Sequence, residues 1–327
     1  MRKFIVPFMT SLLSCSAVFA FWPEAADSSL EVGVGYRRDK FHWETNNSLV
    51  NDVPTRSKIE WRDLNIWQIG IGGKYVTCDN LYFRGYADYG WITSGKARNT
   101  EFAIGDSSIS GASADFNSSS NSSNRSKKGH VYDASLAVGY VFKLCDDSFG
   151  IAPVLGYSWH GQHLNLNSFT APVVGDSSLS SESGSSSKNK FNTRWNGPFL
   201  GLDFDYRFCC EWSVFASYEY HWARYHAKTH FNIDPTVFDG FNQSSKKANG
   251  SIANLGIKWD FCECWTLGLV GQWQWFTARH GHNRERFLLL DDESSNEGAR
   301  EECFRISRVK SVKWQSASIN LTVGMIF

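Results

Sequence analysis

The chain has 327 residues with 33 basic and 33 acidic side chains, and this neutral balance excludes the strongly basic class of nucleic-acid-binding proteins. It contains 14 Trp, 12 Tyr and 24 Phe, more aromatic residues than an ordinary soluble domain needs but typical of a β-barrel with aromatic girdles at both membrane interfaces. No window beyond the N-terminus approaches the roughly 20 apolar residues of a transmembrane helix, which excludes a helical membrane protein.

The N-terminus has the layout of a secretory signal peptide. Arg2 and Lys3 precede a mostly apolar stretch at residues 4–13, and a small-x-small sequence follows. The apolar stretch is too short to anchor the chain in a membrane. We therefore expect residues 1–20 to be removed and residues 21–327 to form one exported domain.

Ten long segments of alternating polarity follow in chain order, a pattern typical of β-strands with two unlike faces. In the last segment, Ala317, Ile319, Leu321, Val323, Met325 and Phe327 share one face, and Ser316, Ser318, Asn320, Thr322 and Gly324 share the other. The ten segments lie near residues 30–43, 57–77, 81–92, 131–144, 149–166, 191–208, 212–232, 248–261, 265–282 and 306–327.

The connections between these segments alternate in length. Four are tight turns, and five are longer, at about residues 47–56, 93–128, 167–190, 233–247 and 283–305. Short periplasmic turns and long external loops are the asymmetry of outer-membrane barrels. The pattern predicts an all-β fold: an antiparallel transmembrane β-barrel of about ten strands in the bacterial outer membrane, in contact with its lipid and lipopolysaccharide. A soluble β-sandwich would have shorter strands of about 5–6 residues.

Six cysteines mark the four tight turns and would therefore lie on one periplasmic rim: Cys78, Cys145, Cys209, Cys210, Cys262 and Cys264. They could bind metal, be chance turn residues, or form disulfides within the rim or with other envelope proteins. We expect no metal site, because no histidine lies at these turns. The oxidising compartment favours disulfides. Cys303 lies in an external loop and makes the count of the exported chain odd.

The polar faces of the strands carry charged residues that would point into the barrel: Arg84, Asp88, Asp133, Asp203, Asp205, Arg207, Glu219 and His221. A narrow interior tolerates charges when they are paired. We expect them to pair and close the lumen, with Arg84 bonded to Asp88 and Arg207 to Asp205. A conducting or binding path is the alternative.

Short stretches of the chain resemble the omptins, the outer-membrane protease barrels. Residues 194–208 are similar to the sixth omptin strand, Ser57-Lys-Ile-Glu-Trp61 to the region before strand two, and Tyr89-Gly-Trp91 to the end of strand three. The resemblance implies ten strands and five external loops. The cysteine usage is similar to that of envelope proteins of chlamydia-like bacteria, and it implies crosslinks to other envelope proteins.

The omptin resemblance also implies a catalytic site: a water held between an Asp pair in the second external loop and an Asp-x-His pair after strand seven. No Asp-x-Asp follows the third segment here, and the later positions hold His230 and Asn232. An asparagine amide cannot act as a base. The remaining acid–base candidates are Glu101, Asp106 and His230.

We therefore expect a non-proteolytic barrel with a structural or surface-exposed, adhesin-like role in the envelope. A diverged omptin-type endopeptidase and a narrow pore remain the alternatives. The sequence indicates no cofactor and no nucleic-acid partner.

Overall fold

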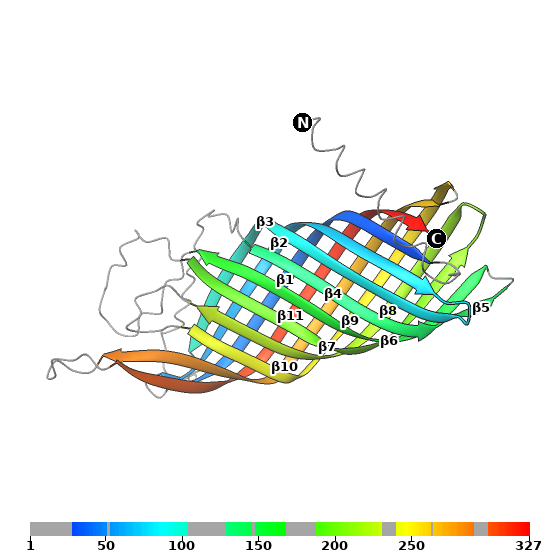
Figure 1. The fold of residues 1–327 in the computed structure, drawn as a ribbon. Helices are drawn as coiled ribbons and strands as arrows, with labels where there is room; N and C mark the ends of the chain where they lie inside the picture. The colour runs from blue at the N-terminus through cyan, green and yellow to red at the C-terminus, as the bar shows by residue number, and fades with distance from the viewer. Residues whose placement is uncertain are drawn as a thin grey trace.

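The computed structural model describes residues 28–50, 53–103, 129–145, 148–167, 188–230, 240–262, 264–290 and 300–327. The predicted signal peptide at residues 1–20 lies outside this part of the chain. The described residues form strands joined by turns (Figure 1), and none of them belongs to a helix that is long and apolar enough to cross a membrane. The strands are β1 (Ser29–Val50), β2 (Val53–Val76), β3 (Leu81–Ala103), β4 (Gly129–Tyr140), β5 (Phe142–Leu144), β6 (Phe149–Asn167), β7 (Lys188–Arg207), β8 (Trp212–His230), β9 (Gly240–Cys262), β10 (Trp265–Leu290) and β11 (Arg300–Ile326).

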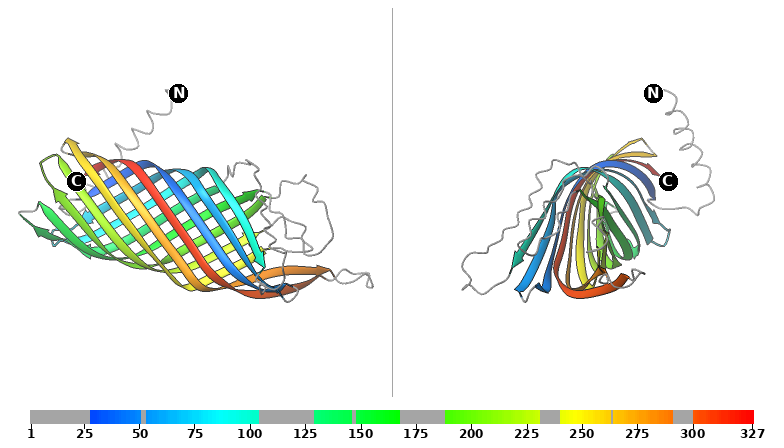
Figure 2. Two further views of the ribbon diagram at one scale, coloured as in Figure 1. Left: turned by 180° about the vertical axis from the view of Figure 1, so that it is seen from behind. Right: turned by 90° about the vertical axis from the view of Figure 1, so that its left-hand side faces the viewer.

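The strands close into one antiparallel barrel. β1 pairs with β11, and β4 pairs with β6, so the sheet has no free edge along these pairings. β5 continues the line of β4 beyond Val141 and pairs with the adjoining part of β6, so the two count as one strand of the wall. The wall therefore has ten strands, as predicted, and they cross it at a steep tilt (Figures 1 and 2).

The two ends of the barrel differ. Ser29 pairs with Ile326, so the first and last described strands meet at the same end as the tight turns. We call this the turn end, and the opposite one the loop end. The six turn cysteines lie along the turn end, which places them on one rim.

The strands extend further toward the loop end than the sequence pattern predicts. β10 and β11 stay paired up to Leu290 and Arg300. The prediction of a loop over residues 283–305 is therefore wrong at 283–290 and 300–305, which are paired strand. Backbone hydrogen bonds hold these strands together whether or not one face is apolar, and alternating polarity was the only signal available.

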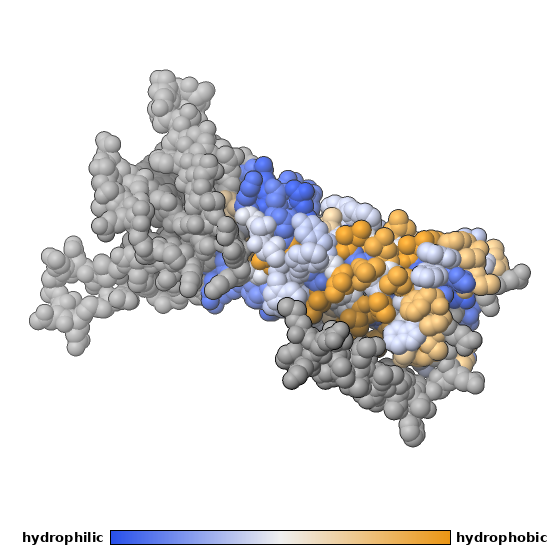
Figure 3. All heavy atoms as spheres, turned by 90° about the horizontal axis from the view of Figure 1, so that it is seen from above, coloured by the Kyte–Doolittle hydropathy of each residue, from blue (hydrophilic) through white to orange (hydrophobic). Residues whose placement is uncertain are grey.

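An apolar band surrounds the outside of the turn half. On β2 the band runs from Trp67 to Tyr75, about nine residues, which is close to the 9–11 residues of a transmembrane strand. Figure 3 shows apolar side chains gathered toward the turn end and hydrophilic ones toward the loop end. The exposed aliphatic residues of the band are Val32, Val34, Ile69, Ile71, Leu136, Val138, Leu155, Leu200, Leu255, Leu269, Ile319, Leu321 and Val323.

Aromatic side chains border the band on both sides, as membrane girdles do. The row on the loop side includes Trp67, Tyr89, Trp91, Trp159, Trp222, Trp273 and Trp275, and the row on the turn side includes Phe83, Tyr140, Phe142, Tyr206, Phe208, Trp212, Trp259, Phe261 and Trp265. In β11, Ile319 is 54% exposed while Ser318 is 9% exposed. The predicted assignment of apolar residues to the outside and polar residues to the lumen is confirmed for the last part of this strand, from Ser316 onward.

Candidate functional site

Aromatic side chains fill the lumen in the loop half. Trp61 on β2 and Phe191 on β7 come from opposite sides of the wall, yet their ring centroids lie 4.8 Å apart. Phe276 lies 5.6 Å from Trp195 and 5.0 Å from Trp314, again as ring centroids. The first two contacts join strands that are not neighbours in the wall, whereas Phe276 and Trp314 face each other on the adjoining strands β10 and β11. We call the buried set the aromatic plug: Phe41, Trp43, Trp61, Phe191, Trp195, Tyr225, Phe241, Phe276 and Trp314.

A β-bulge helps to build the plug. Between Arg62 and Asn65 the pairing of β2 with β3 shifts, and Asp63 has a positive φ of 55°. A bulge adds one residue to one strand, so that beyond it the odd-numbered side chains lie on the face that the even-numbered ones occupied before it. As a result Trp61 points into the lumen, while Trp67, which has the same parity in the sequence, faces outward.

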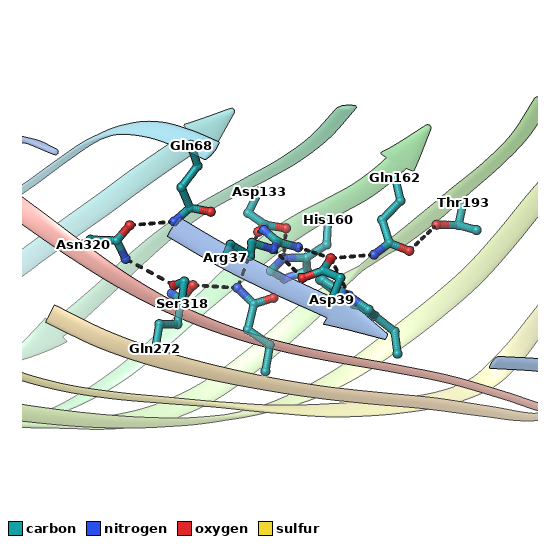
Figure 4. A network of polar contacts seen from close by, with 12 residues as sticks. Arg37, Asp39, Gln68, Asp133, His160, Gln162, Thr193, Gln272, Ser318 and Asn320 are labelled. Carbon is teal, nitrogen blue, oxygen red and sulfur yellow. Dashed lines mark hydrogen bonds and ion pairs between the residues drawn. The ribbon is translucent and has the colours of Figure 1, made fainter. Parts of the chain in front are cut away.

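Below the plug lies a buried polar layer centred on Arg37 (Figure 4). Its guanidinium donates hydrogen bonds to the two carboxylate oxygens of Asp39 at 2.7 and 2.9 Å, and a third hydrogen bond to Asp133. Asp133 also contacts His160 Nδ1 at 2.8 Å, and Trp314 Nε1 donates to Asp39 at 3.1 Å. Because these side chains are almost completely buried, the arginine balances two carboxylates that water cannot reach.

A second buried cluster lies toward the turn end. Arg84 forms ion pairs with Asp203 at 2.8 Å and with Glu219 at 2.7 Å. Glu219 also contacts His221 Nε2 at 2.9 Å, and Tyr82 donates to Asp203 at 3.0 Å. Since Arg84 lies on β3 and Glu219 on β8, this cluster also spans the lumen.

The partners of the lumen charges differ from those expected. Arg84 bonds across the barrel to Asp203 and Glu219, not along its own strand to Asp88. Asp205 lies 4.0 Å from Lys74 rather than pairing with Arg207. Arg84 and Asp88 are four residues apart on one strand, about 13 Å, whereas a narrow barrel brings opposite walls within side-chain reach.

Ser158, His221 and Glu219 form a chain of hydrogen bonds. Ser158 Oγ lies 2.9 Å from His221 Nδ1, and His221 Nε2 lies 2.9 Å from Glu219. Such a chain can activate a serine nucleophile. Here, however, Ser158 is 1% exposed, and the Phe199 ring lies 4.8 Å from the His221 ring. The arrangement is buried among aromatic rings and cannot receive a substrate in this structure.

A cavity of about 480 Å³ occupies the turn half of the lumen. It opens at the turn end, where the Asp205 side chain is 44% exposed. Its lining includes five of the predicted lumen charges, namely Arg84, Asp88, Asp203, Asp205 and Arg207, together with Glu31, Lys74, Tyr82, Tyr86, Lys143 and Lys258.

The structure describes the backbone of two of the residues considered for proteolysis, Glu101 and His230. Backbone pairing places Glu101 on β3 beside Ser57, and His230 on β8 beside Lys190. β3 and β8 are separated by three strands of the wall. Asp106 and Asn232 lie outside the described residues.

The cysteines of the turn end are exposed: Cys78, Cys145, Cys209, Cys210, Cys262 and Cys264. β8 and β9 are neighbours, and the Asp260 N–H donates to the Glu211 carbonyl at 2.7 Å. The turn that holds Cys209 and Cys210 therefore lies beside the end of β9 that holds Cys262. No disulfide joins Cys145, Cys209, Cys210, Cys262 or Cys264 to another of the described residues.

The sequence analysis did not identify the aromatic plug or the role of Arg37. A signal was present in β7. Phe191, Trp195 and Phe199 lie at odd-numbered positions and so share one face, whereas the next apolar residues, from Leu200, lie at even-numbered positions on the other face. Such a change of face within one strand marks the point where the apolar side stops facing lipid and starts facing the barrel interior.

Comparisons with known proteins fit this geometry. A family described as "Pom: Protochlamydia outer membrane protein" matches residues 31–327. The crystal structure of the outer membrane protease OmpT from Escherichia coli has a TM-score of 0.62 and 10% sequence identity, and the match covers 94% of this chain and 99% of OmpT. At that identity the likeness shows a common fold.

Two other solved barrels are much less similar. Neisserial surface protein A has a TM-score of 0.30 and 8% identity, and the match covers 93% of this chain and 100% of that protein. The toluene transporter TodX from Pseudomonas putida has a TM-score of 0.27 and 11% identity, with 97% of this chain and 93% of TodX covered. No curated protein matches the chain.

Proposed function

Because the chain belongs to the Protochlamydia outer membrane protein family and lies in the bacterial outer membrane, we propose that it acts as a closed structural barrel. Its loop end is displayed at the cell surface and serves as an adhesin-like face. In this role the barrel neither cleaves peptides nor conducts solutes.

The observation that carries the proposal is the filled lumen. Rings from opposite walls are in contact in the aromatic plug, with Trp61 and Phe191 only 4.8 Å apart as centroids. Directly below, Arg37 and its carboxylate partners are buried and mutually bonded. A porin keeps a polar, water-filled channel through its centre. Two successive filled layers are instead the interior of a packed protein.

Solute uptake by vesicles tests the closed lumen against the pore alternative. Proteoliposomes containing the refolded chain should swell in arabinose no faster than liposomes without protein. A general-diffusion porin in matched vesicles supplies the positive control. Swelling that increases with the amount of inserted chain would favour the pore.

An endopeptidase is the second candidate function, because OmpT is described as an outer membrane protease. The buried hydrogen-bond chain of Ser158, His221 and Glu219 is the structural feature closest to hydrolytic chemistry. We expect no cleavage of dibasic peptides between about pH 5 and 8, the range in which an imidazole changes charge. The assay is run with and without lipopolysaccharide. Cleavage that disappears in Ser158→Ala would establish a hydrolase and overturn the proposal.

Disulfide crosslinks at the turn end form part of the proposed structural role. The supporting observation is the exposure of the cysteines at all four tight turns, on the rim that faces the oxidising periplasm. Native envelopes run on non-reducing gels should show high-mass species that collapse with reductant. The double variant Cys209→Ser/Cys210→Ser should lose part of this ladder. A monomer under both conditions removes crosslinking from the proposal.

Anionic lipid headgroups are the proposed partners of the outer surface. Exposed basic residues follow the strands on the loop side of the aromatic row: Arg38, Lys40, Arg62, Lys96, Arg194, Arg224, Lys228, Arg279, Arg308, Lys310 and Lys313. Phosphate groups of lipopolysaccharide lie at that height in the outer leaflet. Binding of labelled lipopolysaccharide to the purified barrel should weaken in Arg308→Gln/Lys310→Gln/Lys313→Gln and at high salt. Binding that is insensitive to both changes would exclude these basic residues.

A further inference from the structure

The cavity of the turn half has its charges separated along the barrel axis. Asp88 and Tyr86 lie at its deep end, next to the buried polar layer. Lys74 on β2 pairs with Arg84 on β3, and Asp88 lies four residues further along β3, so about 13 Å of strand separates Asp88 from the level of Lys74. The mouth has a small excess of positive charge: its four basic residues are Lys74, Lys143, Arg207 and Lys258, and the acids beside them are Glu31, which pairs with Lys258, Asp205, which lies 4.0 Å from Lys74, and Asp260.

Hydrogen-bond acceptors without partners are found at the deep end. Among the described residues, Asp88 has neither an ion pair nor a hydrogen bond. The Tyr86 hydroxyl and Asp203 Oδ1 are buried and also lack a hydrogen-bond partner within the described part of the chain. Asp88 is only partly buried and lines the cavity, so its carboxylate can accept hydrogen bonds from a ligand that enters. The deep end is therefore built to accept a donor that carries positive charge.

A primary ammonium group meets this requirement, since it is cationic and donates three hydrogen bonds. The basic mouth would in turn suit a carboxylate at the other end of the same ligand. An extended tripeptide spans about 10 Å, which is close to the depth between the two charged regions. The volume of about 480 Å³ lies within the usual range of small-ligand pockets, about 300–1,000 Å³.

We propose that this cavity binds a short zwitterionic peptide from the periplasm. The ammonium group lies at Asp88, and the carboxylate lies at Lys74, on the inner side of the basic mouth. This activity goes beyond the proposed structural role, because a barrel closed by the aromatic plug can hold a ligand without passing it through. Swelling and cleavage assays do not report on it.

Titration calorimetry with the refolded full chain in detergent micelles tests the site. Triglycine is the probe, and N-acetyltriglycine and triglycine amide each remove one terminal charge. We expect measurable binding of triglycine and about tenfold weaker binding of each blocked peptide, since a charged hydrogen bond contributes enough for that factor. Asp88→Asn should weaken triglycine binding about tenfold. The matched control Asp79→Asn, in the exposed β2–β3 turn, should not change it.

Several results would overturn the proposal. These are the absence of binding heat for triglycine at millimolar concentration, equal affinity for the three peptides, or equal affinity of the Asp88→Asn and Asp79→Asn variants. Heat-modifiable mobility on gels shows whether each variant is folded. If Asp88→Asn fails to fold, the comparison of the three peptides on the unmodified chain still decides the question.

Discussion

Arg37 balances the buried carboxylates of Asp39 and Asp133. Arg37→Met would leave both without a counter-charge, and we expect it to lower the free energy of unfolding by about 3–5 kcal/mol. Arg38→Met is the matched control. Arg38 pairs with Asp63 on the outer surface, where the two side chains are 63% and 45% exposed, so its loss should change the free energy of unfolding much less. Urea unfolding from lipid vesicles measures both, and equal losses would contradict the buried balance.

His42 gives the loop half a dependence on pH. It lies beyond the membrane band, where burial and the nearby Lys58 lower its pKa below the ordinary 6.5. The unfolded chain then binds the proton more readily, so the contribution of His42 to stability is complete above pH 6.5 and is lost as the pH falls below it. Glu60, whose pKa is lowered from 4.5 by Arg62 and Lys58 against the opposing effect of burial, acts only at more acid pH.

The urea concentration at the midpoint of unfolding should therefore decrease for the unmodified chain when the pH is lowered from 7.5 to 5.5. His42→Gln should show a smaller fall over the same interval, because glutamine does not titrate there. If the urea midpoint decreases equally in the variant and in the unmodified chain, His42 does not cause the pH dependence of stability.

At the residue scale, faces were easier to predict than partners. The inward position of Ser318 and the outward position of Ile319 follow from the two-residue period of a strand. The partners of Arg84 depend on how the wall closes, which brings β8 opposite β3. A pattern read along one strand carries no information about the opposite wall.

At the scale of elements, β6 shows how a glycine permits close packing. A Cβ on Gly156 would lie 2.4 Å from the Leu136 carbonyl oxygen and 2.4 Å from the Phe199 ring. Gly150 is on the same strand and face, but its nearest neighbour would be 3.9 Å away. Gly156→Ala should therefore lower the free energy of unfolding by about 1–3 kcal/mol, and Gly150→Ala should change it little. Urea unfolding decides, and equal effects would contradict this packing.

The limits of the strands were predicted well at the turn end, whereas several strands extend further at the loop end than predicted. The tight turns and the apolar alternation located strands such as β6 to within a residue at each end. β9 begins at Gly240, eight residues before its predicted start near residue 248. Outside the lipid, water on the outer face removes the requirement for an apolar side, so the alternating signal fades while the backbone pairing continues.

At the scale of the whole molecule, the barrel class could be predicted and the filling of the loop half could not. The sequence analysis assigned one medium to each face of a strand, with lipid outside and water or charge inside. In the loop half, beyond the apolar band, the apolar residues instead face the lumen and the polar residues face outward: Trp61 points inward and Arg62 points outward. The loop half is thus built like a soluble protein with an apolar interior, and the turn half like a membrane barrel.

The closed lumen is the central property of this barrel, and single-channel current across a planar lipid bilayer tests it most directly. The refolded chain is inserted into the bilayer. Protein recovered from the bilayer is then run on a gel with and without heating, and a shift in mobility on heating shows that it was folded. With the aromatic plug and the Arg37 layer in place, we expect no discrete current steps under an applied voltage. Reproducible steps of constant conductance from the unmodified chain would contradict the closed lumen.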